Sequence, residues 1–226
     1  MSRMASLACL VAVAGASVSA RGDDWVMHVT CDNQFHAYFG GPTATNFDAG
    51  GGDNWGTTYT LNANGRASLD YMYVATASDQ STAQGLIGDF TNTTTGRVSV
   101  TGDAIWEVFP AGAHLSQMGM GSGPWPPSLM PTQVQVDTAI AFATANNLWI
   151  APGHGGLNGV SPWGLRPGIS TDARWIWNNS NGSADPTQGS FNHDEFLVFR
   201  VAGAVPAPGG AALAMLGAVA GLRRRR

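Results

Sequence analysis

Short runs of alternating apolar and polar residues fill most of the chain between Asp23 and Val201. The runs are rich in aromatic and β-branched residues, and Gly, Asn and Asp separate them, which is typical of half-buried strands joined by turns. So many short strands predict a mainly β fold, a jelly-roll-like sandwich of two sheets. The runs span 25–30, 34–39, 57–61, 68–76, 85–90, 97–101, 105–109, 174–178 and 195–201, with turn signals at 62–65 (NANG) and 93–96 (TTTG).

One stretch departs from this pattern and predicts a single short helix. The segment TQVQVDTAIAFATANN (132–147) is rich in Ala and follows Pro131. Val136, Ile140 and Ala143 recur at helical spacing, and Thr132 is a suitable N-terminal cap. The Gly- and Pro-rich stretches on either side, 119–128 and 151–164, are expected to be long loops of the same domain.

The first 20 residues have the layout of a secretory signal peptide. Arg3 precedes an apolar stretch from about Ala5 to Ala16, and the small residues Val18 and Ala20 occupy the −3 and −1 positions of a cleavage site. A retained anchor is the alternative, but the apolar stretch is short for a membrane span. The expected organisation is a signal peptide at 1–20, a β-sandwich domain at 21–204 and a separate C-terminal segment at 205–226.

Charge is distributed unevenly along the chain. All 11 basic residues are Arg, and five of them lie at the two ends, at position 3 and at 223–226. Residues 21–205 carry six Arg against 15 acidic residues, a net charge of −9. Such a body repels phosphate backbones, so nucleic-acid binding is not expected, whereas an acidic surface suits an exported domain.

The two cysteines, Cys9 and Cys31, are not expected to form a disulfide. Removal of the signal peptide would take Cys9 away and leave Cys31 alone. Since Cys31 follows Val29 and Thr30 in a predicted strand, we expect a buried free thiol.

Eight tryptophans divide into two groups by context. Five lie in strand-like runs and are expected in the core: Trp25, Trp106, Trp149, Trp175 and Trp177. The other three, Trp55, Trp125 and Trp163, lie in Gly- and Pro-rich loops. A loop tryptophan can stack on the apolar face of a sugar ring, so these three are candidate glycan contacts. The alternative is that they close the ends of the sandwich.

Acidic residues near the expected first and last strands suggest a calcium site. Calcium takes six to eight oxygen ligands, and Asp23, Asp24, Asp194 and Glu195 would converge if those strands pair. Asp48 and Asp53 offer further oxygens in the stretch FDAGGGDN, which is expected to be a flexible loop. Ordinary solvated acids or turn residues are the alternative. The five histidines lack zinc-ligand spacing, and no other cofactor is expected.

An enzyme is the rival class of function. Glu107 and Glu195 are the only glutamates, and a retaining glycosidase needs two carboxylates about 5 Å apart. The alternative function is therefore a jelly-roll glycoside hydrolase using this pair. No Gly-x-Ser-x-Gly elbow and no phosphate-binding loop occurs, so acyl and phosphoryl transfer have no support.

The segment CDNQFHAYFGG (31–41) resembles a hairpin of galactose-binding-like jelly rolls, with an Asp-Asn start, an aromatic strand and a glycine turn at Gly40-Gly41. The stretches 81–90, 100–109, 172–178 and 194–201 are similar to other segments of that fold. The resemblance implies a jelly-roll sandwich. Proteins of this fold often bind carbohydrate, although a shared fold does not by itself define a site.

The C-terminus carries a short apolar segment followed by four arginines. Gly209 to Leu222 contains 14 uncharged residues, about 21 Å of helix, which is shorter than a bilayer core of about 30 Å. The arginines would stay on the cytoplasmic side and so orient such a span. Plain membrane anchoring is one interpretation.

The order of parts in this tail resembles a PEP-CTERM sorting signal. The matching residues are Pro206, Pro208, Gly209, Arg223, Arg224, Arg225 and Arg226, and Ala207 stands where that motif usually has Glu. The resemblance implies transient membrane insertion, processing by a membrane protease of the exosortase type, and export to the cell surface or extracellular matrix of a bacterium.

These observations together predict an exported, non-enzymatic protein of the cell envelope, cell surface or extracellular matrix. Two versions remain open. One binds glycans such as exopolysaccharide, and the other is a purely structural matrix protein.

Overall fold

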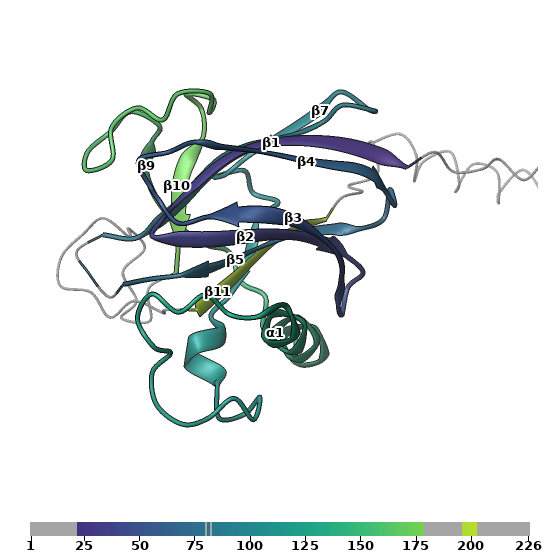
Figure 1. The fold of residues 1–226 in the computed structure, drawn as a ribbon, viewed down its shortest axis with the longest axis vertical. Coiled ribbons are helices and arrows are strands. Elements are labelled where there is room, and N and C mark those ends of the chain that lie inside the picture. The colour runs from purple at the N-terminus through teal and green to yellow at the C-terminus, as the bar shows by residue number, and fades with distance from the viewer. Residues whose placement is uncertain (1–21, 80, 82, 179–195, 203–226) are drawn as a thin grey trace, which may run out of the picture.

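The computed structural model describes residues 22–79, 81, 83–178 and 196–202, and they form two antiparallel sheets packed face to face (Figure 1). The first sheet has the order β4-β1-β6-β10-β9, and β7 also pairs with β6. It comprises β1 (Asp23–Asp32), β4 (Tyr59–Arg66), β6 (Gly85–Asn92), β7 (Arg97–Val100), β9 (Gly153–Leu157) and β10 (Arg174–Trp177). The predicted two-sheet sandwich is confirmed.

The second sheet has the order β3-β2-β5-β11-β8. It comprises β2 (Gln34–Gly40), β3 (Thr45–Gly52), β5 (Tyr71–Ala77), β8 (Glu107–Phe109) and β11 (Phe196–Ala202). The chain passes repeatedly between the sheets, so β1 and β2, which are consecutive, lie in different layers. Within each sheet every pairing is antiparallel, as expected for alternating strands with one face in the core.

The main core lies between the two inner faces. Along β1 the alternation directs Trp25, Met27, Val29 and Cys31 into it, and each is 4% exposed or less. Cys31 is a free, fully buried thiol as predicted, and burial raises its pKa well above its usual value. The other core tryptophans are Trp106 and Trp177, whose rings pack against Phe90 and Phe199.

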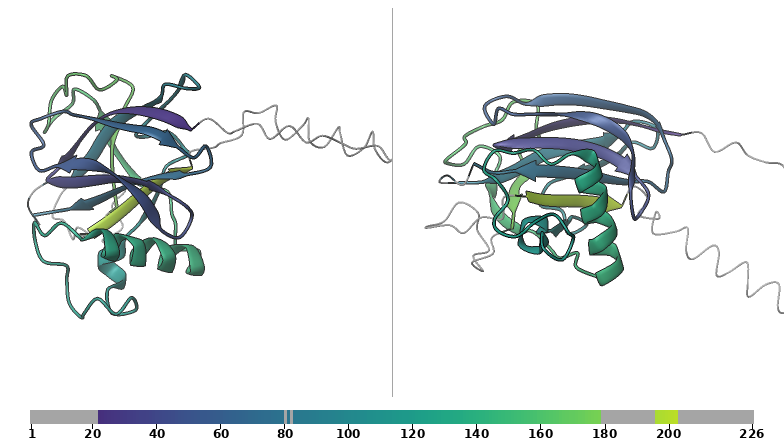
Figure 2. Two further views of the ribbon diagram at one scale, coloured as in Figure 1. Left: turned by 45° about the vertical axis from the view of Figure 1, so that its right-hand side comes forward. Right: turned by 60° about the horizontal axis from the view of Figure 1, so that its bottom comes forward.

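Among the described residues, the α-helix α1 (Gln133–Asn146) covers the outer face of the second sheet together with the short 3₁₀ helix η1 (Ala111–His114) (Figures 1 and 2). Thr132 caps α1 as predicted, and Thr132 and Gln135 form a reciprocal capping box. The helix ends at Asn147, which has a left-handed conformation. Its buried residues pack on outward-facing residues of β5 and β11, including Tyr73, Ala75 and Val198.

Two strands were not predicted because glycine replaces the alternating pattern in both. The stretch FDAGGGDN, expected as a loop, belongs largely to β3, and the predicted loop 151–164 contains β9. The turn predicted at 62–65 is also wrong, since these residues lie inside β4. In β3 the glycines allow close approach: a Cβ on Gly51 would overlap with the carbonyl oxygen of Phe35, and one on Gly52 with the ring of Tyr59.

The predicted signal peptide (1–20) and C-terminal segment (205–226), with the helices expected there, lie outside the described residues. In the part of the chain that is described, no helix combines the length and apolar character needed to cross a membrane.

The hairpin after β2 provides a stability test with an internal control. A Cβ on Gly40 would overlap with the backbone of Ala44 and Thr45, whereas a Cβ on the adjacent Gly41 meets nothing within 4 Å. We expect Gly40→Ala to lower the free energy of unfolding by about 1–3 kcal/mol, and Gly41→Ala to leave it unchanged or slightly higher. Urea denaturation measures both, and equal effects of the two substitutions would contradict this account of the turn.

Candidate functional site

The outer face of the first sheet is covered by the long connection between β9 and β10, residues 158–173, which we call the cover loop. It buries an apolar cluster on that face, formed by Ile87, Trp163, Ile169, Ala173 and Trp175. The rings of Trp163 and Trp175 stack with centroids 3.9 Å apart. This packing holds an irregular segment firmly against the sheet.

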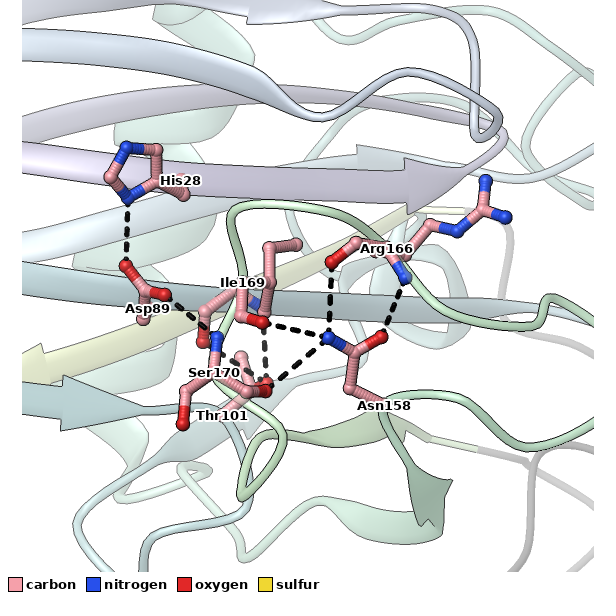
Figure 3. Close-up of polar contacts among 8 residues, drawn as sticks. His28, Asp89, Thr101, Asn158, Arg166, Ile169 and Ser170 are labelled. Atoms are coloured by element: carbon pink, nitrogen blue, oxygen red, sulfur yellow. Dashed lines mark hydrogen bonds and ion pairs between the residues drawn. The ribbon is translucent and has the colours of Figure 1, made fainter.

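A single amide, that of Asn158, fixes the shape of the cover loop (Figure 3). Its Nδ2 lies 3.1, 2.9 and 3.3 Å from the carbonyl oxygens of Arg166, Ile169 and Ser170, and its Oδ1 accepts from the Arg166 N–H at 2.7 Å. Asn158 is 7% exposed. Buried loop carbonyls thereby obtain the donors that a regular ladder would otherwise supply.

Asp89 on β6 ties the cover loop to the sheet. One carboxylate oxygen accepts from the backbone N–H of Ser170 at 2.9 Å, and the other from His28 Nδ1 at 3.0 Å (Figure 3). His28 lies opposite Asp89 on the neighbouring strand β1. Because Nδ1 donates to the carboxylate, Nε2 is an acceptor when the imidazole is neutral. His28 is about one-third exposed, at 34% for its side chain.

Trp55, on the loop between β3 and β4, is the tryptophan that the described structure leaves most exposed, at 41%. Its carbonyl oxygen accepts from Thr30 Oγ1 at 3.1 Å and from Arg166 Nη1 at 3.2 Å. The guanidinium carbon of Arg166 lies 5.3 Å from the centre of the Trp55 ring. The ring is therefore exposed while its backbone is held from two sides.

We call the surface formed by Trp55 and Arg166 the Trp55 face. Farther along the cover loop, the Cβ position of Gly168 lies within 4.0 Å of Thr58 and His28. An aromatic ring beside hydrogen-bonding groups can pack on the apolar face of a sugar and bind its hydroxyl groups. The Trp55 face has this combination.

The described contacts do not form a nucleophilic triad from Ser170, His28 and Asp89. Ser170 contacts Asp89 through its backbone N–H, and its Oγ accepts from the N–H of Asp172 at 3.2 Å. His28 lies beside Asp89, but the described contacts place no hydroxyl against its ring. Among the described residues, this arrangement therefore lacks the hydroxyl–imidazole hydrogen bond of a nucleophilic triad.

The other two loop tryptophans are buried. Trp125 and Trp163 are 4% and 3% exposed, and their indole N–H groups donate to the carbonyl oxygen of Leu129 at 2.6 Å and to Asp32 Oδ2 at 2.7 Å. This placement agrees with the alternative that they close the ends of the sandwich. Among the tryptophans expected in the core, Trp149 is only partly buried and packs against the Arg200 guanidinium at 4.0 Å.

Of the acidic residues named for calcium, three have partners within the fold and Asp23 is buried. Asp23 is 7% exposed, and Asp24 Oδ1 accepts from the Gly65 N–H at 2.8 Å. Asp48 contacts His36 and Gly50, and Asp53 contacts Tyr59. Asp194 and Glu195 lie outside the described residues. No cluster of three potential metal ligands occurs among the described residues, and the calcium site stays a prediction.

Glu107, one member of the predicted glycosidase pair, forms an ion pair on the outer face of the second sheet. Arg200 Nε donates to Glu107 Oε2 at 2.7 Å, and the guanidinium also lies over the rings of Trp149 and Tyr71. The second member, Glu195, is outside the described residues, so the separation of the two carboxyl groups stays a prediction.

Sequence reasoning missed a hollow of about 390 Å³ beside β2 and β3. Its lining includes Gln34, His36 and Tyr59. The alternation of 34–39 is consistent with Gln34 and His36 on the face opposite to Phe35, but the sequence predicts a loop for the glycine-rich segment that forms β3.

The comparisons with known proteins gave no match: no family model matches the chain, and neither the curated proteins nor the solved structures include a significant relative.

Asp32, which accepts the Trp163 indole N–H, makes stability depend on pH. Burial raises the pKa of Asp32 from 3.8 to about 6, and the neighbouring Asp79 adds to the rise, while the hydrogen bond from Trp163 opposes it. The folded state then holds this proton more tightly than the unfolded state, so Asp32 lowers stability as pH rises from about 4 to about 6.

We expect Asp32→Asn to remove this loss, because an amide oxygen still accepts from Trp163 but carries no charge. The variant should gain about 1–2 kcal/mol over the parent protein at pH 7, a value reduced for solvent screening of a partly buried group, and nothing at pH 4. Urea denaturation across this range measures the difference. Parallel stability curves for the two proteins would contradict the assignment.

Proposed function

We propose that the protein is an exported, non-enzymatic component of the cell surface or extracellular matrix that binds carbohydrate through the Trp55 face. The observation that carries the binding proposal is the 41% exposure of Trp55 on a loop whose backbone is held by Thr30 and Arg166. An exposed indole can pack on the apolar face of a sugar ring, and its fixed backbone lowers the entropy lost on binding.

Polar groups around Trp55 supply the rest of a sugar site. The guanidinium of Arg166 donates to the carbonyl oxygens of Trp55 and Trp163, and its positive charge has no carboxylate partner among the described residues. Sugar hydroxyl groups can accept from the guanidinium while the sugar ring packs on the indole. The acidic body supports binding to a glycan over binding to nucleic acid.

The two terminal segments support export and sorting. The signal-peptide layout of 1–20 leads the body across the membrane, and the tail 205–226 resembles a signal for exosortase-type processing. In this proposal the apolar stretch inserts transiently, Arg223 to Arg226 stop it, and cleavage releases the β-sandwich to the surface or matrix.

The non-enzymatic version is supported by the position of Glu107. A general acid or nucleophile must meet its substrate, and the Glu107 carboxylate is bound by Arg200 and packed beside two aromatic rings. A glycoside hydrolase that uses Glu107 and Glu195 is the alternative function.

Replacing Trp55 tests the binding proposal directly. We expect Trp55→Ala to weaken binding to exopolysaccharide fragments at least about tenfold, because stacking and burial of the indole are lost. Isothermal titration calorimetry measures the affinity. Leu69→Ala is the matched control, since Leu69 is 80% exposed and lies beyond the other end of β4. Equal affinity of the parent and Trp55→Ala, or no glycan bound by the parent, would refute the binding version and leave the structural one.

Mass spectrometry of the exported protein tests the sorting proposal. We expect a mature chain that starts near Arg21 and no longer contains Arg223 to Arg226. Replacing these four arginines with Gln should leave a membrane-associated, unprocessed chain, whereas replacing Arg97 with Gln should not. An extracellular chain that still ends at Arg226 would be incompatible with removal of the tail.

A further inference from the structure

The hollow on the second sheet lies at β2 and β3, which run side by side (Figure 1), and Tyr59 at the start of β4 and Met130 also line it. We call it the His36 hollow, and its argued lining residues are Gln34, His36, Gly52, Asp53, Tyr59 and Met130. Its volume of about 390 Å³ is within the range of small-molecule sites, at the lower end, which suits a ligand of one sugar ring.

The floor and one wall of the His36 hollow are fixed by backbone packing. Because Gly52 has no side chain, the ring of Tyr59 lies directly against the backbone of β3. The other side of this ring meets Phe35 edge-on, with centroids 5.6 Å apart. Tyr59 is therefore held in place before any ligand binds.

The polar groups of the hollow are mainly acceptors. Tyr59 Oη donates to Asp53 Oδ1 at 3.3 Å, which leaves Asp53 Oδ2 without a partner among the described residues. His36 Nε2 lies 2.5 Å from Asp48 Oδ1 and the ring stacks on Tyr38, so Nδ1 is the acceptor of the neutral imidazole. The Gln34 amide makes no hydrogen bond within the described structure and can turn toward a ligand.

We propose that the His36 hollow binds one sugar residue that carries no negative charge, either a neutral or an amino sugar. Its hydroxyl or amino groups donate to Asp53, Gln34 and His36, and its apolar face packs on Tyr59 and Met130. The carboxylates of Asp53 and Asp48 repel a uronic acid, and no arginine lines the hollow to offset them. The inference rests on the proposed function only in taking carbohydrate as the class of ligand. The site itself is separate, because Trp55 does not line it.

The test uses the full chain and three monosaccharides of one size: glucose, glucosamine and glucuronate. Ligand-observed NMR titration should show millimolar binding of glucose or glucosamine and at least tenfold weaker binding of glucuronate. We expect Asp53→Ala and Gln34→Ala each to weaken the binding at least tenfold. Asp172→Ala is the matched control, since that carboxylate is exposed and remote from the lining.

If Asp53→Ala disturbs the packing of Tyr59, Gln34→Ala still tests the site. The Gln34 side-chain amide makes no hydrogen bond within the described structure, so its removal should not affect folding. Trp55→Ala separates this site from the proposed function. The hollow is supported if that variant keeps monosaccharide binding while it loses exopolysaccharide fragments. The inference is overturned if the parent binds none of the three sugars, if glucuronate binds as well as glucose, or if neither lining variant changes the affinity.

Discussion

Both sheets of this protein bury apolar side chains on both faces, and this constraint organises the whole molecule. The inner faces share one core, but outward residues such as Tyr73 and Val198 on one sheet and Trp175 on the other are also buried. Each outer face therefore needs a cover. The second sheet is covered by α1, and the first by the cover loop, which has no regular structure of its own.

Covering a sheet with an irregular loop creates a hydrogen-bonding problem that a helix does not have. A helix satisfies its own backbone, whereas the cover loop presents carbonyl and N–H groups next to buried side chains. Asn158 and Asp89 supply the missing partners, and the hydrogen bonds of both side chains hold the cover loop in place. Because the cover loop takes this shape, Arg166 lies beside Trp55. The candidate site therefore results from the way in which the cover loop packs on the first sheet.

The sequence predicts the elements that show a local residue pattern. It misses those that depend on a contact with a residue distant in the sequence. Alternation located β1, and helical spacing with Thr132 located α1. In contrast, Gly52 belongs to a strand because the Tyr59 ring needs its space. Trp55 and Trp163 lie in equally Gly-rich loops, yet only Trp163 is buried, because its indole reaches Asp32, 131 positions away along the chain.

The loop between β3 and β4 connects two surfaces of opposite electrostatic character. Asp53 lines the His36 hollow with a carboxylate, and two residues later Trp55 lies next to the Arg166 guanidinium, which has no carboxylate partner among the described residues. A glycan held at both places would therefore be selected for a neutral or amino residue at one point and would tolerate an anionic residue at the other. Since both surfaces share one anchored loop, the proposed function would make the order of residues along a polymer part of what the protein distinguishes.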